Sequence, residues 1–342
     1  MRFGSVCSGI EAASVAFAPL GWKAAWLAEI EPFPAAVLAH HYPDVPNLGD
    51  MTAVARRVLA GEVEAPEMLC GGTPCQAFSV AGLRESLADE RGNLTLKFVE
   101  LADAIDHVRI TRGDEPAIVF WENVPGVLST KDNAFGCFLA GLAGEDDPLE
   151  PPGGRWANAG AVYGPRRAVA WRTLDAQYFG LAQRRRRVFV VASARKGFDP
   201  AQVLFEWDGL RRDTPPSREA GEGSSAQSAI SVALRGREGG GTAELGDEVQ
   251  NCLRASGGGG DKAHVLTSMS VRRLTPAECE KLQGFPPGYT AIPWRKKPAP
   301  DCPDGPRYKA LGNSWAVPCV AWIGRRIQTV IVASAERAKE LG

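Results

Sequence analysis

The sequence predicts an α/β fold with a mainly parallel, doubly wound sheet and a smaller part of different composition. Over residues 1–130, short apolar segments alternate with segments of helical spacing, which is the rhythm of βαβ units. Residues 209–265 are instead rich in Gly, Ser and Arg. With 342 residues and 44% hydrophobic content, the chain can bury one large core and add a smaller module.

The expected elements of the first part follow in chain order. Apolar runs predict strands at Phe3–Cys7, Ala24–Leu27, Met68–Cys70, Ala117–Trp121 and Arg187–Ala192. Helical spacing predicts helices at Glu11–Leu20, Pro32–His41, Leu94–Val108 and Val317–Val332. In such folds the functional sites lie at the carboxyl ends of the strands.

The Gly-rich segment can be interpreted in two ways. Glycine runs at 239–241 and 257–260 are typical of a disordered linker. However, Ala233-Leu234-Arg235 and Cys252-Leu253-Arg254 precede these runs as a weak internal repeat. Patterned apolar and Arg positions favour ordered loops.

Charge divides the chain into unlike halves that together give a net charge of -1. Residues 1–180 carry 14 Lys and Arg against 23 Asp and Glu, whereas residues 181–342 carry 25 against 17. A basic half fits a polyanionic partner such as nucleic acid, although solvated surface charge can also cluster by chance.

Other features restrict the class of protein. Eight cysteines are too few for a disulfide scaffold, and no spacing with His or Cys completes a zinc set, so we expect no metal. No apolar run reaches about 18 residues, and the first residues lack a secretory layout. We expect no membrane partner and a cytoplasmic location.

Four segments carry side chains suited to chemistry, although each has an ordinary structural alternative. Cys75, in Pro74-Cys75-Gln76, follows a strand and a Gly-Gly turn, where a thiolate can be exposed, but most cysteines are simply buried. Glu122 follows an expected strand and can hold a proton in an apolar setting, or it can be a surface residue at a turn. Residues 183–187 read Gln-Arg-Arg-Arg-Arg, which suits planar polar recognition or a solvated edge strand. Asn313 and Ser314 precede the last helix and can simply cap it.

Taken in order, these segments resemble the DNA (cytosine-5) methyltransferase family. The resemblance covers roughly residues 1–195 and 270–330. It rests on an ordered set of short matches: Cys7-Ser8-Gly9, Glu29, Asp50, Pro74-Cys75-Gln76, Glu122-Asn123-Val124, residues 183–187, residues 273–286 and Leu311-Gly312-Asn313-Ser314.

The resemblance implies a reaction that transfers a methyl group from S-adenosylmethionine to ring carbon 5 of a cytosine flipped out of duplex DNA. Cys75 would be the thiolate that adds to carbon 6, and Glu122 would hold or donate the proton at ring N3. Asn123 would orient this loop, and Arg185 and Arg187 would contact the base edge.

The resemblance also implies a Rossmann-like cofactor site. Its members would be Cys7, Ser8, Gly9, Ile10, Glu11, Glu29, Ile30, Asp50, Met51, Pro74, Asn313 and Ser314. Glu29 would accept from the ribose hydroxyls, and Asp50 would lie by the adenine. The family commonly has Phe-x-Gly-x-Gly-Gly in this first motif, whereas here Cys7, Glu11 and Ala12 replace the Phe and the two later glycines. An aromatic contact to adenine is therefore not expected from this motif, and Glu11 is expected near the methionine amino group.

The resemblance implies three parts: a catalytic and cofactor-binding part at 1–195, an irregular β-rich target-recognition part at 196–300, and a segment at 301–342 that returns to the catalytic part. The expected DNA-binding residues are Gln76, Ser79, Arg235, Arg237 and Arg254. The expected partner is double-stranded DNA, bound by a monomer of prokaryotic or phage origin, with a separate restriction endonuclease possible. Two alternatives remain: a non-catalytic DNA-binding relative, and an enzyme that methylates cytosine in RNA.

Overall fold

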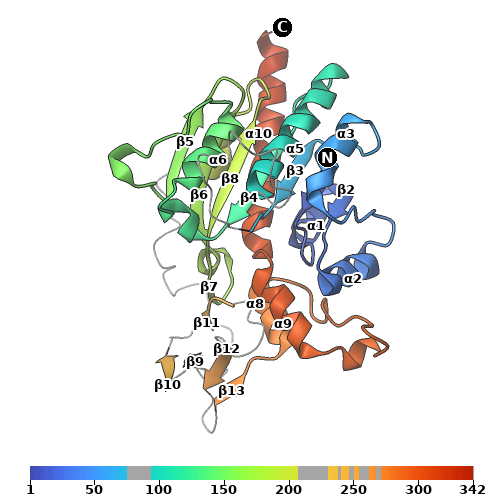
Figure 1. The fold of residues 1–342 in the computed structure, drawn as a ribbon, viewed down its shortest axis with the longest axis vertical. Coiled ribbons are helices and arrows are strands. Elements are labelled where there is room, and N and C mark those ends of the chain that lie inside the picture. The colour runs from blue at the N-terminus through green and yellow to red at the C-terminus, as the bar shows by residue number, and fades with distance from the viewer. Residues whose placement is uncertain are drawn as a thin grey trace.

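The computed structural model describes residues 1–74, 94–206, 230–237, 240–245, 250–253, 262–266 and 271–341. Figure 1 shows a large sheet with helices on both faces in the upper part, and a smaller sheet with short helices below it. The C-terminal helix runs from the lower part up along the large sheet. The chain therefore leaves the upper layer and returns to it.

The large sheet has seven strands in the order β2-β1-β3-β4-β8-β6-β5. Strands β1 to β4 are parallel, whereas β8, β6 and β5 join as antiparallel neighbours, so the sheet is mixed and less parallel than the sequence predicts. The bounds are β1 Arg2–Val6, β2 Lys23–Ala28, β3 Met68–Gly71, β4 Ile118–Asn123, β5 Ala159–Tyr163, β6 Ala168–Asp175 and β8 Arg186–Ser193.

Strand β4 shows why this sheet is covered on both faces. Its residues alternate between two cores: Ile118 and Phe120 belong to one, and Val119 and Trp121 to the other. Because side chains alternate across a strand, a run that is apolar at every position needs cover on both sides.

The helices are α1 Ala12–Phe17, α2 Pro32–His41, α3 Val54–Leu59, α5 Leu94–Thr111, α6 Ala134–Ala143, α7 Pro200–Leu204, α8 Pro276–Gln283, α9 Asp304–Asn313 and α10 Val317–Leu341.

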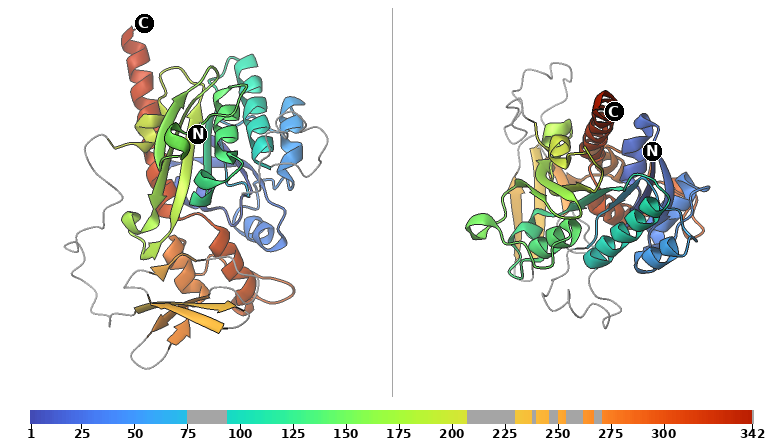
Figure 2. Two further views of the ribbon diagram at one scale, coloured as in Figure 1. Left: turned by 60° about the vertical axis from the view of Figure 1, so that its left-hand side comes forward. Right: turned by 90° about the horizontal axis from the view of Figure 1, so that it is seen from above.

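The described parts of the Gly-rich segment form a four-stranded antiparallel sheet in the order β10-β9-β12-β13, seen at the bottom of the left view in Figure 2. Its bounds are β9 Ile230–Arg237, β10 Gly240–Leu245, β12 Lys262–Leu266 and β13 Val271–Arg273. A short parallel pair, β7 Gln183–Arg184 with β11 Gln250–Asn251, ties this part to the strand that follows in the large sheet. The ordered alternative therefore holds for the described stretches.

Helix α10 is long and apolar, and the stretch Asp304–Arg337 could cross a membrane by length and composition alone. In the fold, however, Val320, Ile323 and Ile327 are fully buried, and α10 packs against α1 and α7. Residues at this spacing form one face of a helix. The apolar face of α10 is thus part of the protein core.

Candidate active site

The loop after β1 has an unusual backbone. Cys7, Gly9 and Glu11 all adopt left-handed conformations, with φ of 48°, 55° and 62°. The sequence predicts that the helix starts at Glu11. In the structure α1 starts at Ala12, and Glu11 caps it by accepting from the Ser14 amide at 3.0 Å. Two non-glycine residues in the left-handed region are strained, and such strain concentrates at functional sites.

Hydrogen bonds hold this loop against the end of β2. The Gly9 amide donates to Glu29 Oε2 at 2.7 Å, and the Ser8 hydroxyl accepts from the Ala28 amide at 3.1 Å. Cys7 Sγ lies 3.7 Å from Met51 Sδ, and burial raises the pKa of the Cys7 thiol to about 12. This thiol is therefore neutral near pH 7, and it packs rather than reacts.

Glu11 is buried beneath the loop rather than exposed on it. Its carboxyl accepts from the Ser5 hydroxyl at 2.9 Å and from the Ser14 hydroxyl at 3.1 Å. Burial raises the pKa of Glu11 to about 7. The Glu11 side chain thus braces the loop from below, and its expected role near the methionine amino group of the cofactor stays a prediction.

The surroundings of the loop fit S-adenosylmethionine. A Cβ added at Gly9 would meet nothing within 4 Å, so space lies open beside this backbone. Glu29 offers carboxylate oxygens at the end of β2, and the next residue, Ile30, is 72% exposed, as a flat adenine face requires. Asp50 is exposed and caps a short turn through the Thr52 amide, whereas Ile10 and Met51 are buried.

The cofactor residues of the C-terminal segment lie where α9 meets α10. Asn313 is exposed at the end of α9, and Ser314 is buried beside it. The Ser314 carbonyl accepts from Arg185 at 2.5 Å. This junction therefore contacts the strand that carries the arginines.

The end of β4 places a carboxyl in a buried polar pocket. Glu122 is 7% exposed, and its Oε1 lies 3.1 Å from Arg187 Nε. Burial raises the pKa of Glu122, while Arg187, Arg185 and the Trp315 side chain lower it by a smaller amount. Among the described residues, Oε1 accepts no well-aligned hydrogen bond. A buried carboxyl oxygen without such a donor fits a bound polar ligand.

Arg185 is a buried brace. Its guanidinium donates to the carbonyls of Leu253, Gly312 and Ser314, so it joins the link between β7 and β8 to two later segments. Its Nε is buried and has no hydrogen-bond partner in the described part of the chain. Arg187 is more open, at 15% exposure of its side chain, and ion-pairs with Glu122. Of the two arginines, Arg187 is the more exposed one.

A second network fixes the turn after β3. Asn123 donates to the Thr73 carbonyl at 2.9 Å and accepts from the Val124 amide at 2.8 Å. The Thr73 hydroxyl accepts from the Trp121 indole at 3.0 Å. These bonds hold Thr73 and the exposed Pro74 beside Glu122.

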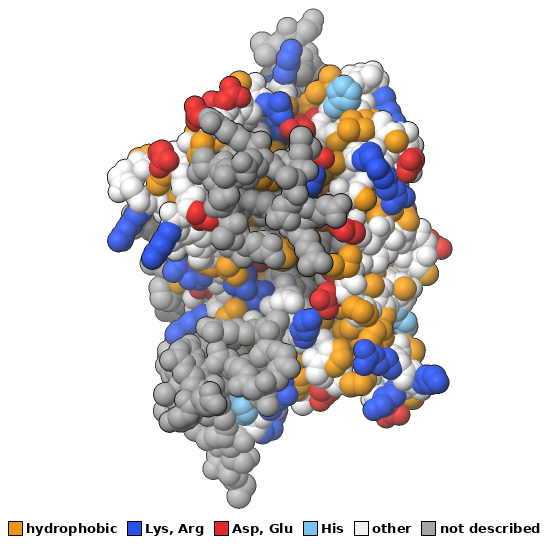
Figure 3. Space-filling model, in the orientation of Figure 1, with side chains coloured by type: hydrophobic (Ala, Val, Ile, Leu, Met, Phe, Trp, Pro, Cys, Tyr) orange, Lys and Arg blue, Asp and Glu red, His pale blue; other side chains and the backbone are white. Residues whose placement is uncertain are grey.

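Several expected site residues cannot be placed. Cys75, Gln76, Ser79 and Arg254 lie outside the described residues. Arg235 and Arg237 lie on β9, opposite Thr242 and Gly240 of β10. Figure 3 shows Lys and Arg side chains at the level where the upper and lower parts meet. This distribution suits a polyanion.

Sequence reasoning missed Trp315 and Thr73. A Cβ at Gly72 would lie 3.0 Å from Trp315 Nε1 and 3.3 Å from Glu122 Oε2, so a larger residue there would push these side chains aside by a few tenths of an ångström. Trp315 directly follows Asn313-Ser314, and Thr73 lies in the Gly-Gly turn, so their positions in the sequence were the available signal.

A family model described as C-5 cytosine-specific DNA methylase matches residues 1–146 and 230–329. The chain belongs to this family. Membership implies S-adenosylmethionine as the cofactor, in agreement with the open space beside Gly9.

Individual proteins are also similar to this chain. The DNA N-6-adenine-methyltransferase of Escherichia phage P1 is 43% identical over 466 residues, covering 98% of this chain but 62% of that protein. The chain thus spans less than two thirds of the phage relative. The Type II methyltransferase M2.BsuMI of Bacillus subtilis (strain 168) is 26% identical, covering 96% of this chain and 75% of the relative. The S. pombe Dnmt2 methyltransferase shares the fold, with a TM-score of 0.59, 16% identity, and coverage of 96% of this chain and 99% of that structure.

Proposed function

We propose that this protein methylates carbon 5 of cytosine in duplex DNA through a covalent adduct with Cys75. The observation that carries the proposal is the buried Glu122 carboxyl, whose Oε1 lacks a well-aligned donor among the described residues. Arg187 is its ion-pair partner, and Cys75 directly follows the Thr73-Pro74 turn that the Glu122–Asn123 segment holds.

Glu122 would supply the proton that makes cytosine reactive. Ring carbon 5 is a poor nucleophile until a thiolate adds to carbon 6 and breaks the aromaticity. Negative charge then builds up toward ring N3, and a carboxyl with a raised pKa can protonate it. Arg187, held at 3.1 Å from Glu122, would face the base edge and stabilise the adduct, while Arg185 braces both from behind.

The cofactor, when bound along the loop of Cys7–Glu11, supplies an electrophilic methyl group. Gly9 would allow close approach of the backbone, Glu29 would accept from the ribose hydroxyls, and Ile30 would lie on the adenine. Elimination of Cys75 after loss of the carbon 5 proton would complete the turnover. The target must leave the base stack, because the neighbouring bases cover both faces of the ring.

The name of the phage P1 relative favours a second candidate, methylation of adenine N6. Transfer to an exocyclic amine needs no nucleophile that adds to the ring, so Cys75 would have no role in it. That relative also contains sequence that this chain does not span, and its activity can lie there.

Product analysis distinguishes the candidates. Unmethylated duplex DNA is incubated with the full chain and S-adenosylmethionine carrying a deuterated methyl group, then digested to nucleosides for mass spectrometry. We expect labelled 5-methyldeoxycytidine only. Labelled N6-methyldeoxyadenosine would replace the proposal with the second candidate, and label found only in a parallel RNA sample would place the substrate in RNA.

The lower sheet is proposed to read the flanking sequence. Base edges in the major groove are distinguished well by Arg, and Arg235 and Arg237 lie on β9, beside the turn to β10. Arg254 is included on sequence grounds. We propose residues 196–300 as the recognition part and 301–342 as the returning segment, of which α10 packs on α1.

A further inference from the structure

The segment between α8 and α9 reaches the cofactor loop through one tyrosine. Tyr289 is 7% exposed, and its hydroxyl donates to the Ile10 carbonyl at 2.8 Å, across 279 residues of sequence. Ile10 lies between Gly9 and Glu11, two of the three left-handed positions of the loop. A residue of the recognition side therefore contacts the backbone of the cofactor loop directly.

Other contacts fix the tyrosine from both sides. The His41 ring stacks on the Tyr289 ring at 4.1 Å and 4°, and His41 Nε2 donates to the Tyr289 carbonyl at 2.7 Å. The Tyr42 hydroxyl lies 3.1 Å from the Tyr289 hydroxyl. Since the Tyr289 proton goes to Ile10, Tyr42 is the donor in this pair. The hydroxyl of Tyr289 is thus aimed at one acceptor.

The loop that carries Tyr289 is itself held rigid. Glu280, which is fully buried, accepts from the Gly288 amide at 2.7 Å and the Thr290 amide at 2.9 Å. Arg307 of α9 pairs with the same carboxylate at 3.1 Å. Both neighbours of Tyr289 are therefore anchored to α8, so the tyrosine acts on Ile10 from a fixed position.

We propose that Tyr289 is a positioning residue that sets the affinity for S-adenosylmethionine by holding the Ile10 carbonyl of the cofactor loop. The inference rests on the proposed placement of the cofactor along Cys7–Glu11. A strained loop holds its shape only when its surroundings fix it, and a loop that is already in its binding shape loses less freedom on binding. Without the hydroxyl, the Ile10 carbonyl and the Tyr42 hydroxyl both lose a buried partner.

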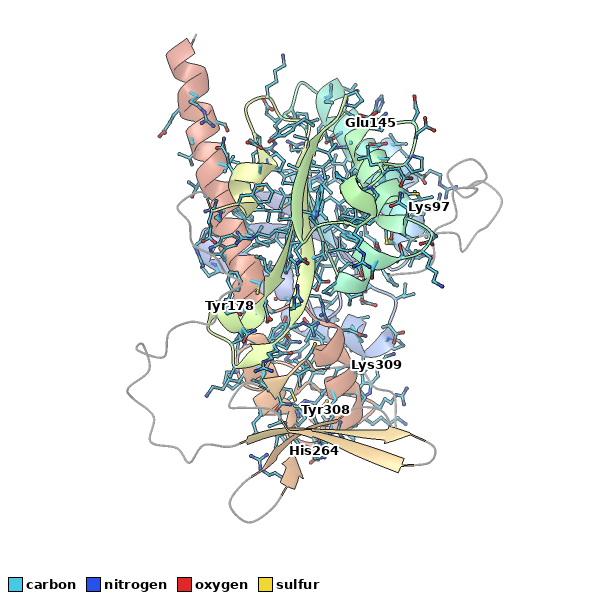
Figure 4. All side chains as sticks on the ribbon, turned by 90° about the vertical axis from the view of Figure 1, so that its left-hand side faces the viewer. Lys97, Glu145, Tyr178, His264, Tyr308 and Lys309 are labelled. Carbon is cyan, nitrogen blue, oxygen red and sulfur yellow. The ribbon has the colours of Figure 1, made fainter. Side chains whose placement is uncertain are left out.

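The test is Tyr289→Phe, which keeps the ring on His41 and removes only the hydroxyl. The matched control is Tyr308→Phe, since the Tyr308 hydroxyl also donates to a backbone carbonyl, that of Leu274 at 2.6 Å, within the lower part. Figure 4 labels Tyr308 near the lower sheet. Calorimetric titration of the full chain with S-adenosylmethionine, without DNA, measures the Kd directly.

We expect the Kd of Tyr289→Phe to rise about fivefold to tenfold, the worth of one hydrogen bond, and that of Tyr308→Phe to stay within twofold of the parent. The KM for cofactor should rise with it, whereas kcat at saturating cofactor should not change. An unchanged Kd in Tyr289→Phe, or an equal rise in both variants, overturns the inference. If Tyr289→Phe does not fold, Tyr42→Phe decides: a Kd rise of about threefold, above the range of the control, supports the inference, and a Kd within twofold of the parent overturns it.

This outcome is separate from that of the proposed function. A parent protein that binds no S-adenosylmethionine would contradict the proposed function. A parent that binds it, with an unaffected Tyr289→Phe variant, would contradict only the role of Tyr289.

Discussion

Glu11→Gln should change how stability depends on pH. Burial raises the pKa of Glu11 from 4.5 to about 7, so the folded protein holds this proton more tightly than the unfolded chain does. Stability therefore falls as the pH rises from about 4.5 to about 7 and is level above that. A shift of this size lowers the free energy of unfolding by about 3 kcal/mol at high pH relative to low pH. Between about 2 and 3 kcal/mol of this loss falls between pH 5 and pH 8.

Glutamine imitates the protonated carboxyl. It can accept from the Ser14 amide through its oxygen and present its amide to Ser5, so the fold is kept while the titration is removed. Urea unfolding followed by Trp fluorescence gives the free energy of unfolding of both proteins at pH 5, 6, 7 and 8. The free energy of unfolding of the variant, minus that of the parent, should rise by between about 2 and 3 kcal/mol from pH 5 to pH 8, with most of the rise below pH 7. A difference that stays constant with pH, or shrinks as pH rises, would refute the reasoning.

Four further predictions concern catalysis and DNA. Glu122→Gln should slow methyl transfer by about 10²–10⁴-fold and leave the cofactor Kd unchanged, because only a proton donor is lost. Single-turnover kinetics measure the rate, and a normal rate would show that Glu122 does not transfer the proton. A duplex with a mismatched target cytosine should bind at least as tightly as a paired one, because it is easier to extrude; clearly weaker binding contradicts base flipping. If Arg235 reads a base, Arg235→Ala should cost about 1–3 kcal/mol of DNA-binding free energy and relax specificity at one position of the recognised sequence. If Arg235 contacts a phosphate, the variant should bind all sequences more weakly, and the slope of log affinity against log salt concentration should fall by about 1. Exchange of residues 210–270 with those of a relative should change the methylated sequence, and no change would remove this segment from recognition.

Much of the fold follows from local sequence pattern. Pro32–His41 begins and ends as predicted, and the apolar runs at residues 3–7 and 117–121 became β1 and β4 within one or two residues. Sheet direction did not follow, because β5, β6 and β8 add as antiparallel neighbours through long-range pairing, which periodicity does not encode.

The site was predictable in its residue types but not in its division of labour. The pattern at residues 183–187 places Arg185 and Arg187 on one side of an extended segment, yet Arg185 is bound to Gly312 and Ser314 carbonyls, while Arg187 meets Glu122. Glu11 was expected to begin the first helix, but it caps that helix from a left-handed backbone position. Both differences depend on partners more than a hundred residues away or on a left-handed backbone, and neither is a local signal.

Covalent trapping tests the central claim most directly. Duplex DNA with 5-fluorocytosine at the target position is incubated with the protein and S-adenosylmethionine, and the products are separated under denaturing conditions and weighed by mass spectrometry. Fluorine cannot leave as a proton does, so we predict a stable complex in which Cys75 is bonded to DNA that carries one added methyl group. The Cys75→Ser variant should not form this complex. Full methyl transfer by Cys75→Ser, or normal release of the fluorinated DNA by the parent, would contradict the mechanism.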